Sequence, residues 1–122
     1  MTPDQIIYAA LTVGSPASGI EAATGGRIYP VRVPLEKPVP AVAYKRVESQ
    51  PEFALHSNVV SWQIVRYEIW CVANDHPTAE SLGDLVEQMN ADGIRVVDRI
   101  SEKGEREDSP FAAILTVDVA VI

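Results

Sequence analysis

The sequence predicts an α+β fold, with a mostly antiparallel four-stranded sheet and two helices packed on one of its faces. The main observation is a long strand-like alternation over residues 59–73 that runs almost directly into a helical spacing of apolar residues over 76–89. A second observation is that segments 94–100 and 111–122 are strand-like and joined by a short charged turn, so they are expected to pair antiparallel. A chain of 122 residues is expected to form one domain over residues 1–122.

The charge balance of the chain limits its expected partners. The formal net charge is −7, from 10 basic and 17 acidic residues. This argues against tight nucleic-acid binding, which needs Lys and Arg to displace counterions from phosphates, and against docking on an anionic membrane. It does not argue against DNA passing nearby, because an acidic wall repels the phosphate backbone. No secretory signal is expected at Met1–Asp4, and no membrane span is expected, because no apolar run approaches about 20 residues.

The first helix is expected to begin at Thr2, which supplies the cap. Pro3 suits the first turn, and Gln5 completes the spacing of a capping box. Glycine and proline residues that follow Val13 are expected to end this helix.

A turn, a short strand and a loop are expected next. Residues 24–26 form a glycine-rich turn, and residues 27–30 resemble a very short strand closed by proline. Residues 31–40 are expected to be extended loop, because proline donates no ladder hydrogen bond and disfavours helix in the residue before it. Residues 41–48 are predicted to be a strand and residues 49–58 a long connection.

The longest predicted strand covers residues 59–73. At about 3.3 Å per residue it would span roughly 50 Å, so we expect a bend, a bulge or a hairpin arm that projects past the sheet. One of its faces is continuously apolar and is expected to pack against a helix, whereas the other has a charged centre flanked by two tryptophans. The first face carries Val65, Tyr67, Ile69 and Cys71, and the second carries Trp62, Ile64, Arg66, Glu68, Trp70 and Val72.

The main helix is predicted to begin with Asp75 as its cap and Pro77 in its first turn, and to end at 90–93, where Gly93 suits a left-handed cap. Its apolar stripe consists of Ala79, Leu82, Leu85, Val86 and Met89. Residues 101–109 are expected to form a charged, solvated turn, with a subunit contact as the alternative. In the final strand, one face carries Ala113, Leu115, Val117, Val119 and Val121, and the other carries Thr116 and Asp118.

No catalytic or metal-binding constellation stands out in the sequence. His56 and His76 have no Cys, His or carboxylate at a recognised metal spacing, and there is no G-x-S-x-G elbow around Ser57. Cys71 lies mid-strand on an apolar face, where a structural thiol is expected rather than a nucleophile. We therefore expect no enzyme activity, no cofactor and no metal.

Four apolar side chains are not readily explained by a single subunit. Phe53 and Leu55 lie in a long connection where polar residues would be expected, and Trp62 and Trp70 lie on the strand face with the charged centre. One interpretation is that the 49–58 connection folds back and the tryptophans cover an edge of the sheet. The other is that a neighbouring subunit buries all four side chains, since aromatic residues are enriched at interface cores.

Several segments occur in an order and spacing that resemble a known family over nearly the whole chain. They are Thr2-Pro3-Asp4-Gln5, Gly26-Arg27-Ile28-Tyr29-Pro30, Pro40-Ala41-Val42-Ala43-Tyr44, Tyr67-Glu68-Ile69-Trp70-Cys71-Val72 followed by Ala79-Glu80-Ser81-Leu82, and Ile114-Leu115-Thr116-Val117-Asp118-Val119. Together they resemble the tail completion proteins of tailed bacteriophages, which are similar to the tail terminators and tail-to-head joining proteins of long-tailed phages. This family has no diagnostic active-site motif, so the resemblance carries over no functional residue.

The resemblance implies a small α+β subunit that forms a ring, commonly hexameric, at the head-proximal end of the virion tail. Such a ring would stop growth of the tail tube and meet the head connector, and DNA would pass through it without specific binding. The implied partners are copies of this chain, the tail tube protein and the head connector protein. Assembly would take place in the host cytoplasm, and the gene could belong to a prophage.

Two other classes of function stay open beside this structural assembly role. A small-ligand binding or regulatory domain would use the same scaffold and would need a deep apolar pocket with convergent polar groups. An enzyme would need a cluster of perturbed titratable groups in a cleft. For the assembly role, the expected contact residues are Phe53, Leu55, Trp62 and Trp70.

Overall fold

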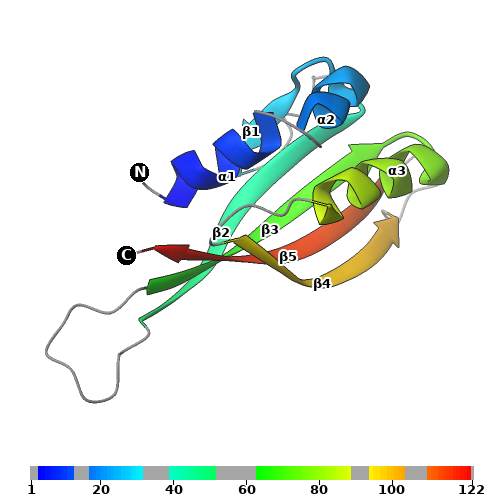
Figure 1. Ribbon diagram of the computed structural model, residues 1–122. Coiled ribbons are helices and arrows are strands. Elements are labelled where there is room, and N and C mark those ends of the chain that lie inside the picture. The colour runs from blue at the N-terminus through cyan, green and yellow to red at the C-terminus, as the bar shows by residue number, and fades with distance from the viewer. Residues whose placement is uncertain are drawn as a thin grey trace, which may run out of the picture.

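The computed structural model describes residues 3–12, 17–31, 39–51, 63–88, 94–103 and 110–121, which form three helices and five strands (Figure 1). The helices are α1 (Pro3–Thr12), α2 (Ala17–Thr24) and α3 (His76–Glu87). The strands are β1 (Ile28–Pro30), β2 (Ala41–Pro51), β3 (Gln63–Ala73), β4 (Ile94–Lys103) and β5 (Phe111–Val121). None of the described helices is long and apolar enough to cross a membrane.

The described strands form one sheet in the order β1-β2-β3-β5-β4. β1 pairs parallel to β2, and every other neighbouring pair is antiparallel. The α+β class and the mostly antiparallel sheet are therefore confirmed, but the predicted number of four strands is wrong. The additional strand is β1, whose three residues pair with Val42–Tyr44 of β2. It coincides with the very short strand expected at residues 27–30, which the predicted four-stranded sheet did not include.

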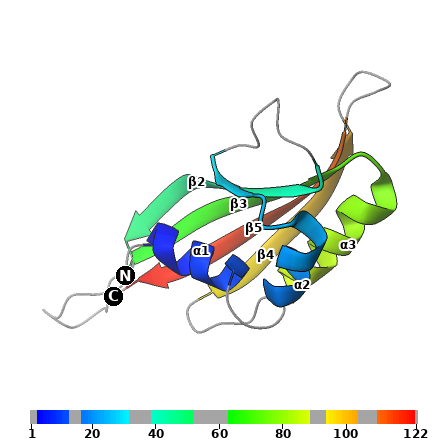
Figure 2. The same ribbon diagram turned by 90° about the horizontal axis from the view of Figure 1, so that it is seen from above.

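The helices cover one face of the sheet (Figure 2). The prediction of two helices omits α2, because the glycine and proline residues after Val13, Gly19 among them, are typical of a segment that ends a helix. A Cβ atom at Gly19 would lie 3.2 Å from Cδ2 of Leu85, so the glycine allows α2 to pack closely against α3. The Asp75 cap of α3 is confirmed: its φ is −127°, and its carboxylate accepts a hydrogen bond from the Thr78 N–H at 3.4 Å. The predicted end of this helix, at 90–93, lies outside the described residues.

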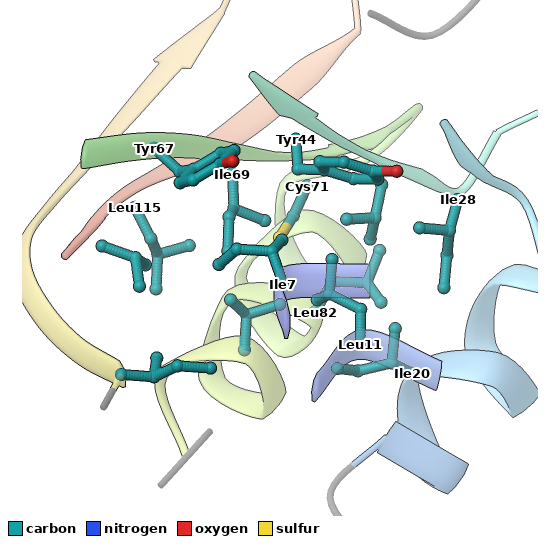
Figure 3. Close-up of a cluster of buried hydrophobic side chains, with 14 of the residues drawn as sticks. Ile7, Leu11, Ile20, Ile28, Tyr44, Tyr67, Ile69, Cys71, Leu82 and Leu115 are labelled. Atoms are coloured by element: carbon teal, nitrogen blue, oxygen red, sulfur yellow. The ribbon is translucent and has the colours of Figure 1, made fainter. Parts of the chain in front are cut away.

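The core lies between the sheet and the helices (Figure 3). The apolar faces predicted for β3 and β5 are confirmed, because their inward side chains are fully buried. These side chains are Val65, Tyr67, Ile69 and Cys71 of β3 and Ala113, Leu115, Val117 and Val119 of β5. They pack against Ile7 and Leu11 of α1, Ile20 of α2, and Leu82 and Val86 of α3. The opposite face of the sheet, called the open face below, carries no described helix.

Of the bend, bulge or hairpin arm expected for the longest strand, the structure shows bulges in the sheet, but in other strands. β3 pairs with β5 in continuous register from Gln63 to Ala73, whereas the register shifts lie in β2, between Arg46 and Glu48, and in β4, between Val96 and Asp98. β2 and β4 also extend beyond their predicted ends, to Pro51 and Lys103. The remaining parts of the predicted 49–58 and 101–109 connections lie outside the described residues.

Candidate functional site

The structure describes one of the four side chains predicted at a subunit interface. Phe53, Leu55 and Trp62 lie outside the described residues. Trp70 lies on the open face, half-buried, and its indole Nε1–H donates a hydrogen bond to Glu68 Oε1 at 3.2 Å. Its place on the face that carries no described helix is compatible with an interface role, which stays a prediction.

The open face carries an apolar row beside charged rows. The strand register aligns Ala43, Trp70, Ile114 and Ile100 across β2, β3, β5 and β4. The neighbouring row contains Lys45, Glu68, Thr116 and Asp98. In the row after it, Arg66 binds Asp118 with Nε–Oδ1 at 2.8 Å and a second nitrogen at 3.1 Å from Oδ2. The predicted charged centre of this face is therefore confirmed, and part of it is already paired within the subunit.

At the β4 edge of the sheet, one arginine forms ion pairs with α3. Arg99 of β4 contacts three carboxylates of α3: Glu80 at 2.6 Å, Asp84 at 2.8 Å and Glu87 at 2.7 Å. Burial opposes the charged form of Arg99, but hydrogen bonds to these carboxylates raise its pKa. The Ser101 hydroxyl donates to Glu80, and this bond and those from Arg99 lower the pKa of Glu80.

The outer side of β4 exposes both apolar and charged side chains. Val97 and Ile100 are 46% and 47% exposed. Glu102 is exposed on the open face, and the backbone N–H of Arg99 donates to Asp98 Oδ1 at 2.8 Å. A carboxylate on an outward-facing N–H and a bulge are both devices that limit unwanted strand addition.

At the other edge of the sheet, β1 covers only the beginning of β2. Val42 N–H donates to Arg27 O at 2.9 Å, and Val31 N–H donates to Tyr44 O at 2.7 Å. No described strand pairs on this side with β2 beyond Tyr44. That part of β2 begins with Lys45, Arg46 and Val47, which are all exposed.

An open groove lies beside α1 at this edge. Asp4, Gln5, Tyr8, Ala9, Thr12 and Tyr44 line a volume of about 510 Å³. The buried Tyr67 hydroxyl donates to Asp4, and burial together with this bond raises the pKa of Tyr67. The Asp4 carboxylate is therefore already engaged by Tyr67 within the subunit, and the groove is open, whereas a small-ligand site is expected to be deep.

Of the candidate chemical residues, Cys71 and His76 lie in the described part of the chain. Cys71 is fully buried, and desolvation raises the pKa of its thiol to about 12, so it stays protonated. His76 is exposed, with Nε2 at 3.5 Å from Glu80 Oε1. Within the described part of the chain, no three His, Cys, Asp or Glu side chains are grouped so as to hold a metal ion. His56 and Ser57 lie outside the described residues.

Comparison with known proteins adds a structural likeness. No family model matches the chain, and no curated protein does. Among solved structures, the chain is similar to one chain of the structure titled "Virion of native gene transfer agent (GTA) particle", with a TM-score of 0.63 and 13% sequence identity. The likeness covers 95% of this chain and 92% of that chain, so the two share a fold over nearly their full lengths.

Proposed function

We propose that the protein is a structural subunit of a phage-like virion that completes or terminates the tail and joins it to the head connector as a ring of copies. The observation that carries the proposal is the fold shared with a chain of a gene transfer agent virion over 95% of this chain. The family resemblance of the sequence supports the more specific role at the head-proximal end of the tail. The tail tube protein and the head connector protein would be its partners.

The geometry of the described residues suits protein contacts more than substrate binding. The charged groups that could act on a substrate are paired with one another, as in Arg66–Asp118 and the Arg99 cluster. In the described part of the chain, no helix covers the open face of the sheet, and the two edges of the sheet differ. The alternative, a small-ligand domain, would depend on the groove beside α1, whose carboxylate already bonds Tyr67.

The proposed role can be tested by deleting the gene of this protein from the strain that produces the virions. Without the protein, we expect tails of irregular length and heads without tails in negative-stain electron micrographs, together with a large loss of transducing or infectious titre. A plasmid copy of the gene should restore joined particles. Normal, fully joined particles in the deletion strain would contradict the proposal.

A further inference from the structure

The two edges of the sheet are complementary in strand direction. Each step across β2, β3, β5 and β4 is antiparallel, so β2 and β4 run in opposite directions. If a second copy is placed beside the first by rotation about an axis along the strands, its β4 lies antiparallel to β2 of the first copy. Contact between two different surfaces, repeated head to tail, yields a ring when the rotation closes.

The backbone N–H and C=O groups that point outward from the β2 and β4 edges also match. Val42 and Tyr44 direct their N–H and C=O groups toward β1, and because residues alternate along a strand, Arg46 faces the same side. Carrying this alternation through the registers of β3 and β5 makes Arg99, Ser101 and Lys103 the outward-facing residues of β4. The outward N–H of Arg99, which meets the Asp98 carboxylate, agrees with this assignment.

One register matches both side chains and backbone. With Arg46 opposite Ser101, Lys45 comes opposite Glu102 and Val47 comes opposite Ile100. Lys45 and Glu102 are exposed on the open face and oppositely charged, and Val47 and Ile100 are 42% and 47% exposed. A shift of two residues would instead place Lys45 opposite Ile100.

The other face of the same register is complementary as well. Arg46 pairs in register with Tyr67, on the face that carries the helices. Opposite it, the Ser101 hydroxyl bonds the Glu80 carboxylate of α3. Arg46 would therefore approach an acidic group, so charges of opposite sign meet on both faces of the joint.

Structural limits make this joint short. Pro30 of β1 already occupies the position opposite Tyr44, the register shift of β2 falls at Val47, the last residue of the joint on that strand, and the register shift of β4 falls at Val97, further along. Pairing is thus confined to Lys45–Val47 and Ile100–Glu102, a length similar to that of β1 on β2. Because the contact is short and is limited by Pro30 and by the bulges, a copy with matching residues can pair there, whereas unrelated strands are disfavoured.

We propose that copies of this chain associate head to tail by antiparallel pairing of β4 with the free edge of β2, with Lys45 opposite Glu102 and Val47 opposite Ile100. The inference rests on the proposed function, because that function calls for a ring, and it names the contact that would build the ring. Serial association of this kind joins the sheets of neighbouring copies.

Disulfide trapping tests the register directly. Opposite residues of a non-hydrogen-bonded pair have Cα atoms about 4.5 Å apart, which suits a disulfide. A chain carrying Lys45→Cys and Glu102→Cys should form a ladder of covalent oligomers on oxidation, resolved on a non-reducing gel. The control chain, with Lys45→Cys and Asp98→Cys, should stay uncrosslinked, and the buried Cys71 contributes no crosslink in either chain. Equal crosslinking of the two chains, or none in the first, would overturn the proposal.

Charge reversal tests the same contact in solution. Lys45→Glu and Glu102→Lys should each raise the concentration of half-association by about tenfold or more in sedimentation velocity, because like charges then face each other. The chain with both reversals should associate as the unchanged protein does. Arg95→Glu, an exposed change of equal size elsewhere on β4, is the matched control. Association unaffected by the single reversals, or not restored by the double one, would reject this contact, whereas the deletion phenotype tests the assembly role independently.

Discussion

At the scale of single residues, Arg99 was not identified from the sequence, although a signal for it exists. Glu80, Asp84 and Glu87 recur at helical spacing on one side of α3, and such a stripe of carboxylates suits a nearby cation. What the sequence does not show is that β4 places that cation beside α3, with its nitrogens 2.6–2.8 Å from the carboxylate oxygens. The burial of Cys71, by contrast, was predicted from strand alternation and is confirmed.

Replacing Arg99 should destabilise the protein. Arg99→Ala removes the ion pairs between β4 and the three carboxylates of α3 and leaves those carboxylates to repel one another. We expect a loss of about 1–2 kcal/mol in the free energy of unfolding at pH 7, reduced from the value of a buried pair because two of the carboxylates are more than half exposed. Urea unfolding followed by circular dichroism measures it, and Arg95→Ala, on the same strand, should cost much less.

The pH dependence of stability should change in the same variant. The folded-state pKa of Glu80 is lowered, so its stabilising effect is complete above the unfolded pKa of about 4.3 and is lost as pH falls through the folded pKa. In Arg99→Ala, Glu80 loses its bonds to the guanidinium, so less stability is lost when this carboxylate is protonated. The difference in stability between the two proteins should therefore hold from pH 7 to about pH 4.3 and shrink as the pH falls below that value. A difference that stays constant on acidification below about pH 4 would contradict the assignment.

We expect the buried Cys71 thiol to make the protein less stable at alkaline pH. Its thiol has a folded-state pKa of about 12, whereas an unfolded thiol titrates near pH 8.5. The unfolded state therefore releases this proton first, so stability should fall as pH rises above about 8.5. Unfolding curves between pH 8 and pH 10 measure the effect. Cys71→Ala should be less stable at neutral pH, because it leaves a cavity, but its pH slope in this range should be shallower.

At the scale of elements, periodicity predicted the long segments and failed where close packing decided the structure. β3, β5 and α3 carry strong periodic patterns and were placed correctly. α2 was missed because Gly19 and neighbouring small residues resemble a turn, although the glycine allows contact with Leu85. A bulge was one of three possibilities expected for the longest strand, but β3 pairs with β5 in continuous register. The irregularities fall instead in β2 and β4, where one side of the strand is less constrained.

Gly83 of α3 is a second position at which close packing requires a glycine. A Cβ atom there would lie 2.8 Å from an Arg99 nitrogen and 3.0 Å from Ala113 Cβ. Gly83→Ala gains about 1 kcal/mol in helix propensity, but overpacking costs about 1–3 kcal/mol, so we expect a net loss near 1 kcal/mol in thermal or urea unfolding. Ser81→Ala, at an exposed site of the same helix, should be neutral or slightly stabilising. In an Arg99→Ala background the cost of Gly83→Ala should shrink, because the crowded guanidinium is gone.

At the scale of the whole molecule, the fold class was accessible from the sequence, whereas the candidate contact surfaces were only partly so. Composition and alternation indicated one sheet with helices on one side, because burying an apolar face is a property of each element separately. The edge complementarity of β2 and β4 depends on register across four strands, which no local pattern encodes. Lys45 and Glu102 are ordinary exposed charges in the sequence. Their relation appears once the ladder between them is known.

The salt dependence of self-association distinguishes the charged joint from general repulsion between acidic subunits. With a formal net charge of −7, copies of the chain repel one another, and added salt would promote association if apolar contacts alone held them together. If Lys45–Glu102 and Arg46–Glu80 pairs form the joint, salt screens an attraction at short range and weakens association. The screening length falls from about 10 Å at 0.1 M salt to about 3 Å at 1 M. We therefore expect the half-association concentration from sedimentation velocity to rise between 50 mM and 500 mM NaCl, and the Lys45→Glu variant to show the opposite trend. Stronger association of the unchanged protein at high salt would indicate an apolar interface elsewhere, such as the row that contains Trp70.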